Sequence, residues 1–415
     1  FLAGRVGSGT YLTSEASVPA RRRPARAALR PRAGWTFAPS PTTAEQPPPR
    51  YDFRAGVPDA ALFPFDTWRR LVASHIRPGA HRPGGYAEPS GYRPLREAIS
   101  RYLAYSRGVT ADPDDVVVTA GSQQALDLVG RVLLQPGDHV AVEDPGYPPA
   151  RDLFASLGAQ VVPVPVDDAG LVVDRLPRRA RLVYVTPSHQ FPLGVTMSLA
   201  RRRALLEWAD TCGAAVVEDD YDSEFRFSPR PLQPLHVLDA SGRVIYVGTF
   251  SKTLIPALRL GFVVAPGGLR SALRAARQLS DGHGPVATQA ALAQYLDEGL
   301  LARHIRTATR VYAARHAALR ESLQSRLAGT LEPLSSEAGL HLAARAPWHS
   351  FEVTETVVDE CRAAGVGIGT LGSYALRRPG QAGFVFGYGA IPVERVAEGV
   401  ARFAAILDAH ARRSP

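Results

Sequence analysis

Hydrophobic and polar positions alternate in two ways from residue 51 onward. Short apolar runs, typical of strands buried on both faces, are separated by stretches with the three-to-four-residue period of amphipathic helices. Strands are predicted at 115–120, 139–144, 159–166, 181–187, 214–220, 243–250 and 259–266, and helices at 67–76, 94–107, 122–134, 149–158 and 198–212. This alternation predicts a mainly parallel sheet covered by helices on both faces.

The pattern changes after residue 267. Helices are predicted up to about residue 328, and after them come strands at 339–344 and 383–388 and helices at 352–364 and 392–410. We therefore expect an α/β protein with a large mainly parallel sheet domain over 51–300 and a smaller C-terminal α+β domain over 301–415.

The first 50 residues differ in composition from the rest. The opening FLAGRVGSGTYLT has a strand-turn-strand pattern, and such a hairpin needs further structure to pack against. Residues 16–50 are rich in Pro, Ala and Arg, which predicts a linker. Eight arginines against Glu15 and Glu45 give residues 1–50 a charge of +6, out of +9 for the whole chain. These arginines either contact a phosphate backbone or belong to a solvated tether, and both interpretations stay open.

Other bulk features exclude some classes of protein. No apolar run approaches the roughly 20 residues of a membrane-spanning helix, so we expect no membrane segment. The two cysteines, Cys212 and Cys361, lie far apart and match no metal-ligand spacing. They favour a reducing, cytoplasmic compartment and predict no metal site.

Lys252 is the only lysine in the chain, since the other 47 of the 48 Lys+Arg residues are arginine. Chance in an arginine-rich composition is one explanation. Chemistry is the other, because an amine can lose its proton and form an imine with a carbonyl, whereas a guanidinium stays protonated and is no nucleophile. The surroundings of Lys252 have to decide between them.

Polar residues follow the predicted strands at their carboxyl ends, where ligands bind in sheets of this kind. Gly121, Ser122 and Gln123 open a helix whose free N–H groups suit an anion, although an ordinary serine cap has the same pattern. Tyr147 lies in a Pro/Gly turn, where its ring could stack on a flat ligand. His189 lies in the loop TPSHQFPLG and, taken alone, is typical of a hydrogen-bonded loop histidine.

The strand AAVVEDD ends in an acidic cluster. Strand alternation directs Asp219 and Tyr221 to one side and Glu218 and Asp220 to the other. Taken alone, the cluster is also compatible with a solvated acidic turn.

The stretch VGTFSKTLIPALRLG adds two hydroxyls, an amine and a guanidinium around one turn, from Thr249, Ser251, Lys252 and Arg259. Together with the anion site, the aromatic ring and the carboxylate, these groups suit pyridoxal 5'-phosphate. Its phosphate fits the anion site, its ring nitrogen stays protonated beside a carboxylate, and its aldehyde forms an imine with lysine. On this interpretation Lys252 is retained because arginine cannot form the imine.

The motifs TPSHQFPLG, EDDYDSEF and GTFSKTLIPALRLG resemble, in order and spacing, those of fold-type I pyridoxal phosphate-dependent transferases, the aspartate aminotransferase-like superfamily. In particular they resemble its MocR branch, in which a GntR-type winged-helix DNA-binding domain is fused to an aminotransferase-like domain. The resemblance covers 51–415. It implies that 1–15 is the remnant of a wing hairpin, that 16–50 is the interdomain linker, and that the chain is the downstream part of a longer protein. It also implies a homodimer with sites at the interface, and DNA binding only through the winged helix.

The resemblance assigns roles to the candidate site residues. Lys252 would form the imine, Asp219 would pair with the pyridine nitrogen, and Tyr221 would hydrogen-bond the ring hydroxyl. The ring would stack on Tyr147, and His189 would be a further cofactor contact. The phosphate would be held by Ser122, Gln123, Thr249, Ser251 and Arg259, and by Tyr86 from the other subunit.

One departure from the family bears on function. Members that process amino acids carry an arginine in the small domain that binds the substrate carboxylate, and here Val385 stands in its place in FVFGYGAI. Arg377 and Arg378 are candidates to replace it. We therefore expect a transcription regulator that senses pyridoxal phosphate or an amino compound joined to it. A working aminotransferase is the alternative, and a fold that no longer binds the cofactor is disfavoured by Lys252 and Asp219 together.

Overall fold

The computed structural model describes residues 2–7, 9–12, 30, 32, 35–37, 47–77, 85–227, 233–377 and 382–413. The chain divides into two compact units, residues 1–40 and 41–415. In the first unit β1 (Leu2–Arg5) and β2 (Gly9–Leu12) form an antiparallel pair, which confirms the strand-turn-strand pattern. Most of the predicted linker at 16–50 lies outside the described residues.

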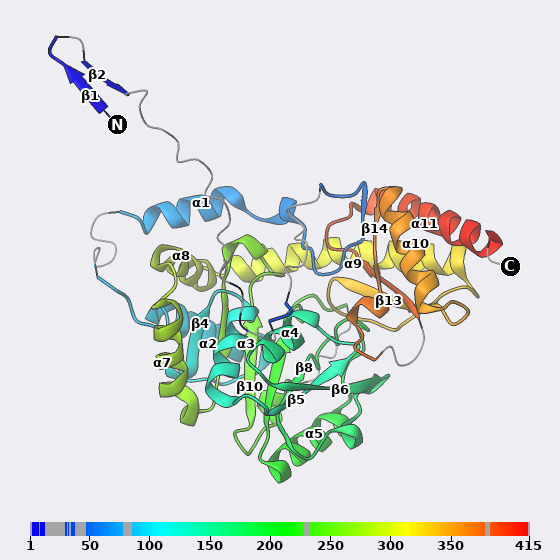
Figure 1. Cartoon of the computed structure of the whole chain (residues 1–415), viewed down its shortest axis with the longest axis horizontal. Coiled ribbons are helices and arrows are strands. Elements are labelled where there is room, and N and C mark those ends of the chain that lie inside the picture. The colour runs from blue at the N-terminus through cyan, green and yellow to red at the C-terminus, as the bar shows by residue number, and fades with distance from the viewer. Residues whose placement is uncertain are drawn as a thin grey trace. The chain divides into compact units, whose positions relative to one another are not determined.

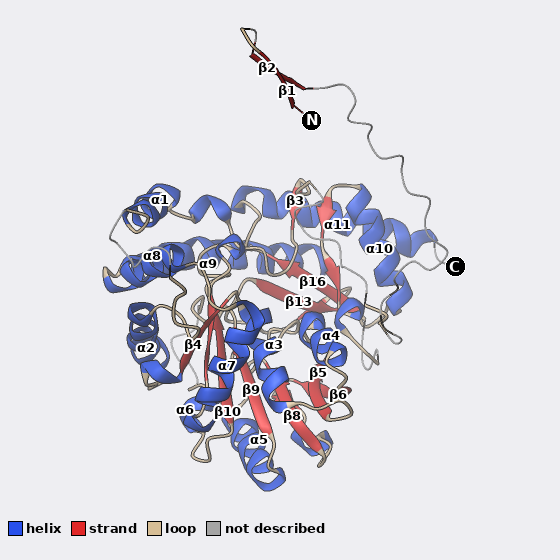
Figure 2. Ribbon diagram, turned by 60° about the vertical axis from the view of Figure 1, so that its left-hand side comes forward, coloured by secondary structure: helices blue, strands red, loops and turns tan. Residues whose placement is uncertain are grey.

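An eight-stranded sheet forms the centre of the larger unit, in the order β4-β11-β10-β9-β8-β5-β6-β7 (Figure 2). Neighbouring strands from β10 to β6 are parallel, whereas β11 is antiparallel to both β10 and β4, and β7 is antiparallel to β6. The predicted mainly parallel sheet is confirmed. Its strands are β4 (Val116–Thr119), β5 (His139–Asp144), β6 (Gln160–Asp167), β7 (Gly170–Leu171), β8 (Ala180–Val185), β9 (Ala215–Asp220), β10 (Val244–Thr249) and β11 (Gly261–Val264).

Helices cover both faces of this sheet because its strands are apolar on both sides. Val117 and Val263 pack under α3, α4 and α7, whereas Val116 and Val264 pack on the opposite face with α1, α2 and α8. Helices α5 and α6 flank the rest of that opposite face. The helices are α1 (Phe65–Ser74), α2 (Arg93–Arg107), α3 (Ser122–Leu133), α4 (Pro148–Ser156), α5 (Leu199–Cys212), α6 (Leu235–Leu238), α7 (Arg270–Asp281) and α8 (Val286–Asp297).

The C-terminal part has its own antiparallel sheet, in the order β12 (Glu332–Pro333), β13 (His341–Arg345), β16 (Gly383–Gly387) and β15 (Gly369–Thr370). Its core is shared with α9 (Leu300–Leu327), α10 (Phe351–Ala363) and α11 (Val393–Arg413), drawn from yellow to red in Figure 1. Strand β3 (Tyr51–Asp52) pairs with β14 (Val366–Gly367), and Tyr51 and Phe53 lie in this same core. The segment at 51–53, which we expected in the large domain, thus packs with the C-terminal sheet.

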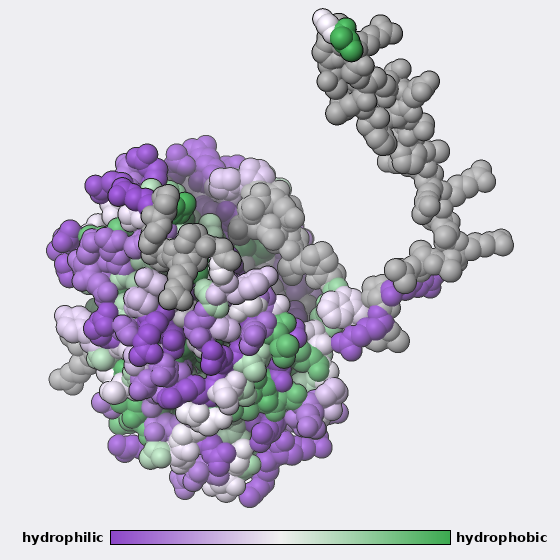
Figure 3. Space-filling view, turned by 90° about the vertical axis from the view of Figure 1, so that its left-hand side faces the viewer, coloured by the Kyte–Doolittle hydropathy of each residue, from purple (hydrophilic) through white to green (hydrophobic). Residues whose placement is uncertain are grey.

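Hydrophilic residues cover most of the face shown in Figure 3. Several large apolar side chains of the larger unit are nevertheless exposed, among them Phe65, Ile76, Tyr86, Tyr105 and Leu279. None of the described helices is long and apolar enough to cross a membrane.

Candidate functional site

A cavity of about 300 Å³ lies at the carboxyl ends of the parallel strands. Nine of the eleven predicted site residues line it, and Tyr86 and His189 do not. The lining residues are Ala55, Gly56, Ser122, Gln123, Tyr147, Tyr184, Thr186, Phe191, Asp219, Tyr221, Thr249, Ser251, Lys252, Pro256 and Arg259. The sheet thus brings together side chains from distant parts of the sequence, as the strand-end pattern predicts.

One end of the cavity is suited to an anion. Helix α3 begins at Ser122 without a side-chain hydrogen bond from its N-cap residue Gly121, so N–H groups of its first turn face outward. Gly121 has φ +82°, and a Cβ there would lie 3.1 Å from the Arg259 guanidinium nitrogens. Arg259 is the one non-glycine residue with positive φ in the described chain, at 52°. The local backbone is therefore strained to hold a guanidinium beside a helix N-terminus, which favours phosphate binding.

The hydroxyls of Thr249 and Ser251 lie at the same end. The Thr249 hydroxyl donates to Ser251 Oγ at 3.0 Å, and the Ser251 N–H donates to Thr249 Oγ1 at 3.2 Å. This tight turn after β10 directs both side chains into the cavity, where they add hydroxyl groups to the anion site.

Asp219 lies deep in the cavity with one carboxylate oxygen unused. Its Oδ2 accepts a hydrogen bond from the Tyr184 hydroxyl at 2.7 Å, whereas Oδ1 is buried and has no partner among the described residues. Burial raises the pKa of Asp219 to about 7, against the opposing effects of Tyr184 and Lys252. A protonated ring nitrogen would give Oδ1 the charged donor that it lacks, so the site fits the expected pyridine ring.

Lys252 follows β10 and faces Asp219 across the cavity. Its Nζ donates to the carbonyl oxygen of Gly56 at 2.7 Å. Burial lowers the pKa of the Lys252 amine, while the carboxylates of Asp222 and Asp219 act in the opposite direction. A lowered pKa increases the neutral fraction of the amine, which is the form that attacks a carbonyl.

Aromatic rings surround the remaining space. Tyr147 and Phe191 meet edge to face with ring centroids 5.7 Å apart, and Phe191 meets Tyr221 in the same way at 6.1 Å. The sequence analysis missed Phe191, Tyr184 and Thr186. Strand alternation around RLVYVTP could have identified Tyr184 and Thr186, since they lie two residues apart at the end of β8 and share one face.

The opposite face of β9 confirms the predicted alternation. Asp220 forms an ion pair with Arg107 at 2.8 Å and accepts a hydrogen bond from Tyr246, and Glu218 accepts backbone N–H groups of α6. Burial by itself would raise the pKa of Asp220, but Arg107 outweighs it and the pKa is lowered. Asp220 therefore stabilises the fold on the side away from the cavity.

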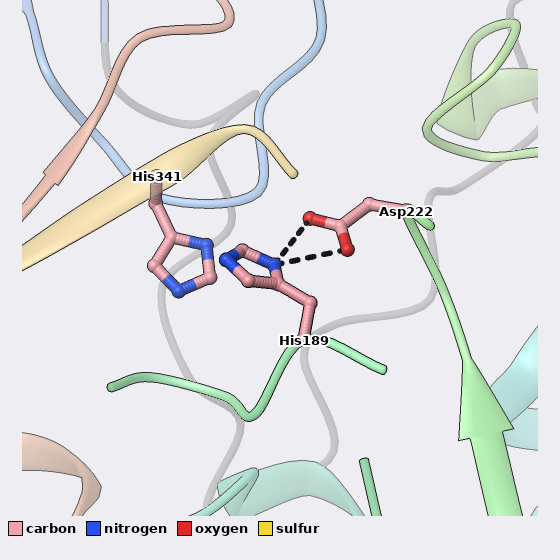
Figure 4. A group of neighbouring side chains, drawn as sticks. All are labelled: His189, Asp222 and His341. Carbon is pink, nitrogen blue, oxygen red and sulfur yellow. Dashed lines mark hydrogen bonds and ion pairs between the residues drawn. The ribbon is translucent and has the colours of Figure 1, made fainter. Parts of the chain in front are cut away.

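His189 lies behind Tyr221 and is 1% exposed. It forms a buried group with Asp222 and His341, close enough for a shared metal ion (Figure 4). Its Nδ1 already contacts Asp222 at 3.0 Å and its Nε2 contacts Ser336 Oγ at 3.1 Å, while Nε2 of His341 contacts a backbone carbonyl. These contacts make the group a hydrogen-bonded cluster, so any effect of His189 on a ligand acts through Tyr221.

Tyr86 is 99% exposed and lies against the edge of the His283 ring, outside the cavity of its own chain. Its predicted contact with a second subunit stays a prediction.

Val385 lies in a fully apolar environment. Its side chain is 0% exposed and packs with Leu193, Val195, Leu334, Ala343 and Leu371. Arg377 is exposed, and its backbone N–H donates to Asp144, whereas Arg378 lies outside the described residues. Among the described residues that line the cavity, the cations are Lys252 and Arg259.

Comparisons with known proteins agree with this geometry. The family model described as aminotransferase class I and II matches residues 63–355. The chain is 39% identical over 418 residues to the probable rhizopine catabolism regulatory protein MocR of Rhizobium meliloti, covering 96% of this chain and 82% of that protein. It is 33% identical to the HTH-type pyridoxine biosynthesis transcriptional regulator PdxR of Corynebacterium glutamicum, covering 84% and 74%. The crystal structure of LysN, the alpha-aminoadipate aminotransferase of Thermus thermophilus complexed with N-(5'-phosphopyridoxyl)-L-leucine, is similar with a TM-score of 0.79 and 30% identity, covering 87% and 92%.

Proposed function

Because the chain belongs to the class I and II aminotransferase family and, within it, to the MocR-type transcriptional regulators, we propose that residues 41–415 are the effector-sensing part of such a regulator. Pyridoxal 5'-phosphate is its cofactor, and Lys252 is the residue to which the cofactor attaches. The observation that carries the proposal is the cavity itself. It joins the only lysine of the chain, an unpartnered Asp219 oxygen and a guanidinium at the N-terminus of α3.

Each side chain has a defined task toward the cofactor. When bound, pyridoxal phosphate supplies an aldehyde that captures amines and a ring that withdraws electrons. Asp219 keeps a proton on the ring nitrogen, and Lys252 provides the neutral amine. Arg259, the N–H groups at the start of α3 and the hydroxyls of Ser122, Thr249 and Ser251 bind the phosphate, with Gln123 beside them. Tyr147 covers the ring and Tyr221 binds its hydroxyl.

The apolar environment of Val385 supports regulation over turnover. An amino acid substrate needs a second guanidinium for its carboxylate, and Arg259 is already used for the phosphate. The described residues that line the cavity supply no other cation besides Lys252. The effector is therefore pyridoxal phosphate itself or an amino compound that does not depend on a carboxylate clamp. An active aminotransferase is the second candidate, favoured by the similarity to LysN.

The regulator is further proposed to act as a homodimer in the cytoplasm, with DNA contacts made by a winged-helix region. The exposure of Tyr86, together with exposed Phe65 and Leu279, supports an apolar surface that a second copy would cover. In that dimer Tyr86 of one subunit would contact the phosphate in the other.

The presence of a single lysine makes a decisive test possible. The protein is mixed with pyridoxal phosphate, the absorption spectrum is recorded, and borohydride is added to make the attachment permanent. Peptide mass spectrometry should locate the added mass on Lys252, since the N-terminal amine is the only other amine in the chain. The Lys252→Arg variant keeps the charge and should show no adduct. An unmodified Lys252 peptide in the wild-type protein would refute the proposal.

A further inference from the structure

Tyr221 is held in the cavity by one residue through two contacts. The Tyr221 hydroxyl donates to the backbone carbonyl of His189 at 2.9 Å, and its oxygen lies 3.1 Å from His189 Nδ1. The two rings lie 5.9 Å apart at an angle of 30°. Since Tyr221 lines the cavity and His189 does not, His189 determines where the phenol lies without touching the ligand space.

The hydrogen-bond partners of His189 determine where its proton is. Both oxygens of Asp222 lie near Nδ1, at 3.0 and 3.1 Å. A carboxylate oxygen only accepts, so Nδ1 carries the hydrogen, and Tyr221 has to donate to the His189 carbonyl. The phenol oxygen is thereby left with lone pairs for Nδ1–H and for a group in the cavity. Burial raises the pKa of Tyr221 well above its usual value, so the phenol keeps its proton.

The same contacts reach the C-terminal sheet. Asp222 Oδ2 accepts the N–H of Leu340, just before β13, at 3.2 Å. His189 Nε2 lies 3.1 Å from Ser336 Oγ, and the Ser336 hydroxyl donates to the carbonyl of Ala338. A Cβ on Gly339 would lie 2.1 Å from the His189 ring, so only glycine lets the segment 336–340 pack this closely. Figure 4 shows His341 of β13 beside this contact.

We propose that His189, held by Asp222 and Ser336, is a positioning residue that fixes the Tyr221 hydroxyl in the cofactor cavity and connects it to the segment 336–340. The inference rests on the proposed function, since it requires a cofactor beside Tyr221. Cofactor binding then affects the start of the C-terminal sheet through Tyr221, His189 and Asp222.

A double-mutant cycle tests the positioning role. The Kd of pyridoxal phosphate is measured by absorbance titration for the wild type, His189→Phe, Tyr221→Phe and the double variant. Each single change should weaken binding about fivefold to tenfold, as expected for the loss of one hydrogen bond. The double variant should be within about twofold of Tyr221→Phe, because His189 acts only through the phenol.

A matched control uses the neighbouring histidine. His341 is equally buried, its ring centroid lies 4.5 Å from that of His189, and its Nε2 contacts the carbonyl of Pro192. His341→Phe should bind the cofactor within about twofold of the wild type. If His341→Phe and His189→Phe weaken binding equally, or if the effects of His189→Phe and Tyr221→Phe multiply, the positioning role is refuted.

Hydrogen exchange provides a second measurement that needs no change at His189. Pyridoxal phosphate should slow exchange in a peptide covering 336–342 of the wild type, and this slowing should be lost in Tyr221→Phe. Equal protection in both proteins would overturn the connection to the C-terminal sheet. A wild type that takes up no pyridoxal phosphate at Lys252 would overturn the proposed function as well, so the two failures are distinguishable.

Discussion

Asp219 and Asp220 are adjacent in sequence, and their replacement by asparagine should have opposite consequences. In Asp219→Asn the amide cannot act as the counter-charge of a protonated ring nitrogen. A hydrogen bond to a charged group contributes about 1.5–3 kcal/mol, so the Kd of pyridoxal phosphate should rise by about 10- to 150-fold. The fold itself should not be weakened, because Asp219 is a buried carboxylate with an unpartnered oxygen.

The pH dependence follows from the same burial. The pKa of Asp219 rises from 3.8 to about 7 in the folded protein, so the folded state binds this proton more tightly than the unfolded state does. The stability of the cofactor-free protein is therefore reduced as pH rises from about 4 to 7, by about 4 kcal/mol at 1.36 kcal/mol for each pKa unit. Asp219→Asn should remove this loss, so that cofactor-free Asp219→Asn unfolds at a higher temperature than the wild type at pH 8.

Asp220→Asn should do the reverse. Its carboxylate neutralises Arg107, and both side chains are buried, so the change leaves a buried guanidinium without its counter-charge. The expected cost is about 3–5 kcal/mol of folding free energy. The Kd for the cofactor, measured at a temperature where the variant is folded, should stay within about twofold of the wild type. Thermal unfolding and absorbance titration of both variants measure the two effects separately. A larger loss of affinity in Asp220→Asn than in Asp219→Asn would refute the assignment of the two faces of β9.

Three further predictions follow from other parts of the chain. Gly121→Ala places a Cβ against Arg259 and should weaken binding of pyridoxal phosphate about tenfold but leave binding of phosphate-free pyridoxal unchanged; Gly213→Ala, also at positive φ but in open space, is the control, and equal losses for both ligands would contradict the phosphate role. With common α-amino acids and 2-oxoglutarate, turnover should be slow or undetectable because Val385 supplies no carboxylate partner, and multiple turnovers in a coupled assay would exclude the regulator-only interpretation. The Arg-rich segment 16–50 should bind unrelated DNA duplexes with equal affinity that falls as salt increases, so a mobility shift that depends on sequence would contradict it.

The secondary structure and most of the cavity could be predicted from the sequence because both depend on local pattern. Apolar runs such as DVVVTA bury both faces whatever surrounds them, so the strands and their order of appearance follow directly. The residue after a strand lies at the edge where the carboxyl ends meet, which is why Ser122, Asp219 and Lys252 line one cavity as expected. The side on which Asp219 lies also follows from the two-residue period of a strand.

Other features depend on contacts between segments far apart in the chain. Tyr51 and Phe53 pack in the C-terminal core because β3 pairs with β14, more than 300 residues away, and no local pattern encodes that pairing. His189 lies behind Tyr221 because Ser336, Gly339 and Leu340 of the C-terminal part pack against it. A histidine in a loop has the same sequence pattern whether it touches a ligand or holds a residue that does. Only the tertiary structure decides between these roles, because it determines which polar groups lie within hydrogen-bonding distance once the chain has packed.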